Sequence, residues 1–151
     1  MTATNHVLTG ILVVSVVSNP VIALPLALAS HFAIDALPHY DNKLIGKDSL
    51  AFKIILGADM YLASMCLLLV LLLGPANAGL LLLGGILAAS PDIMWLPDFI
   101  AANRQQPQPV YGSIRRFHSK IQWSTKPKWA WVEAAYFVIA FVVAFGYTIS
   151  A

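Results

Sequence analysis

The sequence has little cysteine and little charge, and each shortage argues against a class of protein. Cys66 is the only cysteine, which excludes an internal disulfide, and its apolar run MCLLLVLLL argues against thiolate chemistry. Charged residues are 11% of the chain. The basic ones lie between apolar blocks, so no surface for nucleic acid is expected. No Lys or Arg precedes the first apolar block, which argues against a cleaved secretory signal.

Apolar residues, in contrast, make up 59% of the 151 residues. They come in long blocks without alternation, which excludes a closed barrel and favours helices surrounded by lipid. We therefore predict an all-α, polytopic helical membrane protein that forms a single integral membrane domain over residues 1–151. The expected membrane helices are 6–18, 21–37, 50–73, 78–100 and 129–149.

Turn and break signals separate these blocks. Ser-Asn-Pro at 18–20 and Gly-Pro-Ala-Asn at 74–77 are typical of tight turns. Ser-Pro-Asp at 90–92 predicts a kink or restart within the fourth block, because proline removes a backbone hydrogen bond. The first two blocks are shorter than the roughly 20 residues that cross a bilayer. Whether this hairpin spans the membrane fully is left open.

The basic residues predict the orientation. All nine Lys and Arg residues lie in or beside two segments, 38–49 and 101–128, and none lies in the turns at 18–20 and 74–77. With five crossings both basic segments fall on one side, which the positive-inside rule makes cytoplasmic. We expect a multi-pass protein of the cytoplasmic (inner) membrane, with its N-terminus inside and its C-terminus outside.

Ionisable residues gather at the end of the second block. His31, Asp35, His39 and Asp41 form the pattern His-x3-Asp-x3-His-x-Asp. His31 and Asp35 share a helix face, and Pro38 should turn the chain so that His39 and Asp41 fold back over it. Imidazole and carboxylate together suit a divalent metal, zinc first and manganese second.

Other candidates come from distant segments. His6 begins the first block, Asp92 lies where the fourth block nears the cytoplasm, and His118 lies in the second basic segment. Asp59 lies about three turns inside the third block, where an unpaired carboxylate is costly, so it should have a metal or another partner. Taken singly, His6 and His118 are better explained as solvated interface residues, and Asp92 could be a carboxylate favoured at a helix N-terminus. Convergence on one side favours a shared metal site.

Three stretches resemble a known family. They are Asn-His-Val-Leu-Thr-Gly at 5–10, Ser-His-Phe-Ala-Ile-Asp-Ala-Leu-Pro-His-Tyr-Asp at 30–41 and Arg-Phe-His-Ser at 116–119. The chain resembles the membrane-bound metal-dependent hydrolases, also described as LexA-binding inner-membrane-associated hydrolases. That family is distantly similar to zinc-dependent phospholipase C and P1 nuclease, which share the His-x3-Asp element. The resemblance implies phosphoester hydrolysis.

The resulting hypothesis is metal-dependent hydrolysis of a phosphoester in a lipid or lipid-linked substrate at the cytoplasmic membrane face. Asp41 is the candidate base, and His118 is the candidate acid or a further ligand. Arg115, Arg116 and Lys120 are candidates for a phosphate clamp, although anionic-lipid contact is the simpler interpretation. The expected partners are the bilayer and the substrate, and the oligomeric state is left open. The expected metal ligands are His6, His31, Asp35, His39, Asp59 and Asp92.

Two alternatives use the same residues differently. A cation carrier or regulatory protein would bind an ion without breaking a bond, and Asp59 within a helix favours it, although no internal repeat is evident. An intramembrane aspartyl protease would need two carboxylates sharing a proton, for which Asp41 and Asp59 are the candidates. That alternative leaves the histidines unused, so we rank it low. A serine esterase ranks lower still, because the sequence contains no Gly-x-Ser-x-Gly.

Overall fold

A computed structural model describes residues 1–40 and 45–150 as an all-helical protein, with no strand in the part of the chain described. Three stretches are long and apolar enough to cross a membrane: Leu50–Leu73, Ala78–Asn103 and Pro127–Ile149. The helices in chain order are α1 (Ala3–Val16), α2 (Pro20–Asp35), α3 (Leu50–Leu73), α4 (Ala78–Ala89), η1 (Ser90–Trp95), α5 (Leu96–Asn103), α6 (Ser113–Ile121), η2 (Pro127–Trp129) and α7 (Ala130–Ser150).

The first hairpin is shorter than the three long stretches and differs slightly from its predicted bounds. Helix α1 has 14 residues and α2 has 16, beginning three and one residues earlier than expected and each ending two residues earlier. The Asn19 side chain caps α2 by accepting a hydrogen bond from the Val21 amide at 2.9 Å. Pro20 at the first helical position has no N–H to satisfy. Full crossing by this hairpin remains a prediction.

The fourth predicted block changes helix type where its prolines lie. Helix α4 ends at Ala89, a 3₁₀ segment follows over Ser90–Trp95, and α5 continues to Asn103. Pro91 and Pro97 cannot donate backbone hydrogen bonds, so the regular α-helical ladder is interrupted near both. The 3₁₀ segment places Asp92 close to the N-terminal half of α1.

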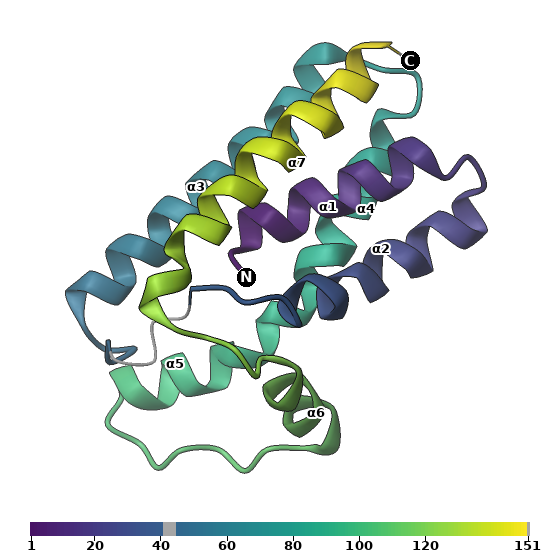
Figure 1. The fold of residues 1–151 in the computed structure, drawn as a ribbon. Coiled ribbons are helices and arrows are strands. Elements are labelled where there is room, and N and C mark those ends of the chain that lie inside the picture. Colours follow the sequence, from purple (N-terminus) through teal and green to yellow (C-terminus); the bar gives the residue numbers. More distant parts are fainter. Residues whose placement is uncertain (41–44, 151) are drawn as a thin grey trace.

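Helix α1 lies at the centre of the fold. It contacts α2, α3, α4 and α7, and Figure 1 shows it between the long pair α3 and α7 and the pair α2 and α4. Its side chains are correspondingly buried, with Leu8 and Ile11 fully so. Gly10 packs against Gly84 of α4, where a Cβ added to Gly10 would lie 2.2 Å from the Gly84 carbonyl oxygen. Small residues therefore let these two backbones meet.

The second basic segment contains the short helix α6 between the end of α5 and the start of η2. The chain that follows α6 pairs with the chain that follows α2. The His39 amide donates to the Ser124 carbonyl at 3.2 Å, and the Lys126 amide donates to the His39 carbonyl at 3.2 Å. This pairing holds α6 beside the C-terminal end of α2 (Figure 1).

Candidate metal centre

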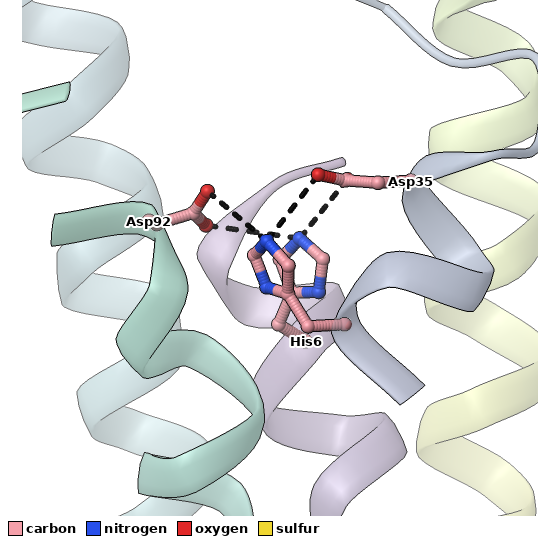
Figure 2. Close-up of side chains that lie close together, drawn as sticks. His6, Asp35 and Asp92 are labelled. Atoms are coloured by element: carbon pink, nitrogen blue, oxygen red, sulfur yellow. Dashed lines mark ion pairs between the residues drawn. The ribbon is translucent and has the colours of Figure 1, made fainter. Parts of the chain in front are cut away.

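Four side chains from three parts of the chain meet at one buried point. His6 comes from α1, His31 and Asp35 from α2, and Asp92 from η1. One ligand atom from each lies within 4.8 Å of the other three. Figure 2 shows Asp35 and Asp92 approaching His6 from opposite sides. We call these four residues the His/Asp cluster.

The distances within the His/Asp cluster place both imidazoles close to both carboxylates. His6 Nε2 lies 3.2 Å from Asp35 Oδ1 and 3.7 Å from Asp92 Oδ2. His31 Nε2 lies 3.4 Å from Asp35 Oδ2 and 3.8 Å from Asp92 Oδ1. Each imidazole therefore points one nitrogen at both carboxylates, which is the convergence that a single cation requires.

A backbone carbonyl of α4 fixes the orientation of the His31 ring. Its Nδ1 lies 2.9 Å from the Ala88 carbonyl oxygen. A carbonyl only accepts, so Nδ1 carries the proton and Nε2 is left with a lone pair directed into the cluster. This is the arrangement seen at metal-binding histidines, whose second nitrogen donates to an oxygen.

His6 supplies the observation that fits a cation site. Its side chain is fully buried and neither ring nitrogen has a hydrogen-bond partner among the described residues. Its ring stacks on that of His31 with centroids 3.9 Å apart. Burying an unpaired polar group is costly, and a cation bound by Nε2 would satisfy that nitrogen. Two imidazoles and two carboxylates also form a donor set that suits zinc or manganese.

Two side chains from the α6 region border the His/Asp cluster. His118 Nε2 lies 2.7 Å from Asp35 Oδ2 and 3.0 Å from His31 Nε2. Gln122 donates from Nε2 to the same Asp35 oxygen at 2.9 Å, while the Met1 amino group bonds the other oxygen. Asp35 is thus the central acceptor, and His118 is close enough to serve as a proton donor or a further ligand.

The structure does not bring every predicted ligand to this point. His39 is buried, but its Nδ1 donates to the Leu37 carbonyl at 2.7 Å, and it is not one of the four converging residues. Burial lowers the pKa of His39 from its ordinary value. Asp41, the candidate base, lies outside the described residues.

Asp59 hydrogen-bonds to backbone amides of α1 and does not belong to the His/Asp cluster. Its two carboxylate oxygens accept hydrogen bonds from the backbone amides of Ala3 at 2.8 Å and Thr4 at 3.0 Å. One oxygen also accepts from the Thr4 hydroxyl at 2.6 Å. These amides are the unpaired N–H groups of the first turn of α1, where a carboxylate is favoured by the helix dipole. Asp59 caps a neighbouring helix and thereby positions the α1 segment that carries His6.

Replacing Asp59 by alanine is expected to lower stability and to loosen α1. Two backbone N–H groups would lose their acceptor, at a cost of about 1–3 kcal/mol each when they stay dry. Thermal unfolding in detergent, followed by circular dichroism, measures the loss. Ser64→Ala is the matched control, because Ser64 is exposed on the same helix and bonds only the Met60 carbonyl in this structure. An Asp59→Ala protein as stable as the control would contradict the capping role.

The three candidate phosphate ligands differ in their exposure and in whether they form an ion pair. Arg115 is turned inward and forms an ion pair with Asp98, and it lies 3.9 Å from the centroid of the Tyr111 ring. Arg116 and Lys120 are exposed. Arg115 is therefore already paired, and the other two are directed to the surroundings of the protein.

Three further polar residues, two of them buried, were not predicted as part of any site. Asp98 is 4% exposed and pairs with Lys47 as well as Arg115. Glu133 is 8% exposed and accepts a hydrogen bond from the side-chain amide of Asn5 at 2.7 Å. Gln122 contacts Asp35 directly. The sequence holds one signal for each of two of these residues. Gln122 follows His118 by one turn of helix, and Glu133 is the only glutamate of the sequence and lies in an apolar block.

Comparison with described protein families, curated proteins and solved structures finds no match to this chain. The assignment of function therefore depends on the geometry of the site.

Proposed function

We propose that this protein is a membrane-embedded, metal-dependent hydrolase that cleaves a phosphoester of a lipid or lipid-linked substrate. The observation that carries the proposal is the His/Asp cluster, in which ligand atoms of three buried residues and of the partly exposed Asp92, from three parts of the chain, lie within 4.8 Å of one another. Such a cluster is expensive to bury near lipid unless it has a function. The resemblance of residues 5–10, 30–41 and 116–119 to membrane-bound metal-dependent hydrolases points to the same chemistry.

The residues that would hold the cation are His6, His31, Asp35 and Asp92. A divalent cation there supplies Lewis acidity toward a water molecule and toward phosphoryl oxygens. His118 lies beside the cluster on a different helix, so it is the residue placed to give a proton to the leaving oxygen. Its 2.7 Å contact with Asp35 Oδ2 holds the ring beside the cluster.

The proposed membrane arrangement is five crossings, with the basic segments 38–49 and 101–128 on the cytoplasmic side. Its support is the charge distribution together with three long apolar helical stretches and two shorter ones. In this arrangement the His/Asp cluster lies near the cytoplasmic ends of α2 and α4, where a phosphate headgroup is within reach. The N-terminus is then inside and the C-terminus outside.

Metal content tests the proposal directly. Mass spectrometry of detergent-purified wild type is expected to give stoichiometric zinc or manganese, and a His31→Ala, Asp35→Ala double variant is expected to have lost it, because both ligands are removed. Hydrolysis of phospholipid and phosphodiester substrates should disappear in the same variant and in chelated wild type, and return when the metal is restored to wild type. Full hydrolysis by chelated protein would overturn the metal-dependent mechanism.

The alternative is a cation-binding carrier or regulatory protein without hydrolytic activity. The sequence feature that favoured it was Asp59 inside a membrane helix, and that carboxylate is occupied by the amides of Ala3 and Thr4. The hydrolase is therefore the better-supported proposal. Stoichiometric metal with no hydrolysis, together with cation flux in vesicles, would favour the carrier.

A further inference from the structure

Helix α6 presents three distinct faces, each defined by residues spaced three or four apart. The inward face carries Arg115, His118 and Gln122, which contact Asp98 or Asp35. The apolar face carries Ile114 and Phe117, which are 69% and 55% exposed. The basic face carries Arg116 and Lys120, both exposed.

The apolar face is part of a larger exposed surface. Val110 is 99% exposed and Trp123 is 72% exposed, and they lie just before and just after α6 in the chain. Large apolar side chains next to exposed cations are typical of a helix that lies in the plane of a membrane interface. Because α6 is joined to helices long enough to cross a membrane, it is held close to a bilayer surface.

The charged residues of the chain segment that contains α6 are all basic. From residue 99 to residue 132 the sequence has no Asp or Glu, and its basic residues there are Arg104, Arg115, Arg116, Lys120, Lys126 and Lys128. Arg115 is neutralised by Asp98, while Arg116 and Lys120 are exposed. A surface of this charge complements anionic phospholipid headgroups.

We propose that α6 is an interfacial helix that docks onto anionic phospholipids of the adjoining leaflet. Ile114 and Phe117 enter the acyl boundary, and Arg116 and Lys120 bind the headgroup phosphates. The docking does not depend on whether the cluster hydrolyses a substrate.

Cysteine labelling in nanodiscs tests the docking. In a Cys66→Ala background, Ile114→Cys and Phe117→Cys are reacted with a water-soluble maleimide in phosphatidylglycerol and in phosphatidylcholine nanodiscs. Both positions are expected to react slowly in phosphatidylglycerol and several-fold faster in phosphatidylcholine. Gln108→Cys, on an exposed loop position, is the control and should react quickly in both.

Neutralising the basic face measures how much charge contributes to docking, apart from the contribution of apolar contact. Each of Arg116→Gln and Lys120→Gln is expected to weaken docking on phosphatidylglycerol about fivefold, the factor that corresponds to ~1 kcal/mol per basic residue. The double variant should make labelling independent of lipid charge. Equal protection in both lipids would overturn the anionic preference, and labelling as fast as Gln108→Cys in both would overturn the docking itself.

Discussion

Replacing Asp35 by asparagine is expected to abolish stoichiometric metal binding and to lower phosphoester hydrolysis by more than about 100-fold. Losing a partner that only orients a ligand costs about 10–100-fold, and Asp35 is a proposed ligand that also orients others. Its oxygens lie 3.2 Å from His6 Nε2, 3.4 Å from His31 Nε2 and 2.7 Å from His118 Nε2. Asparagine keeps the size of the side chain but removes the negative charge and one acceptor.

The measurement is metal content by mass spectrometry, followed by hydrolysis with added zinc or manganese. Asp48→Asn is the matched control, because Asp48 is exposed and outside the His/Asp cluster. It should keep full metal content and activity. An Asp35→Asn protein that retains stoichiometric metal would show that the cluster does not hold it, whatever substrate the protein acts on.

The helices of this fold follow from local sequence signals. Leu50–Leu73 is an apolar stretch bounded by a Ser49 cap and by Gly74, whose φ of 61° suits glycine, so its predicted and observed bounds agree. The break after Ala89 follows from Pro91 in the same local way. The helices of the first hairpin begin one to three residues earlier than predicted, where the Thr2 and Asn19 side chains cap them.

The His/Asp cluster was predictable where its residues share a helix and less so elsewhere. His31 and Asp35 are four residues apart in α2, which alone puts them on one face. His6 and Asp92 were proposed to lie near them from topology, and the structure brings all four together. Asp59 shows the limit of that argument. Depth in the third block indicated that it needs a partner, but only packing shows that the partner is the first turn of α1.

The same limit applies to charges that pair across distant segments. Asp98 and Arg115 are 17 residues apart and belong to different helices, so no helical spacing links them. Glu133 accepts from Asn5, 128 residues away. Sequence indicates that such carboxylates are costly to bury, and the fold decides which donors reach them.

Replacing Gly10 by alanine is expected to destabilise the fold and to weaken the metal site together. The added Cβ would lie 2.2 Å from the Gly84 carbonyl oxygen and 2.8 Å from the Ala88 Cβ, so α1 and α4 must move apart. Overpacking of this kind costs about 1–3 kcal/mol, or more when backbone blocks relaxation. Because α1 carries His6 and α4 leads into Asp92, the same movement separates two proposed ligands.

Gly57→Ala separates this packing effect from a general effect of alanine. A Cβ at Gly57 meets nothing within 4 Å, and alanine favours a helix over glycine by about 1 kcal/mol. Gly57→Ala is therefore expected to raise the unfolding temperature in detergent, and Gly10→Ala to lower both that temperature and metal content. If Gly10→Ala were as stable as Gly57→Ala with its metal retained, the close approach of α1 and α4 would not be what positions His6.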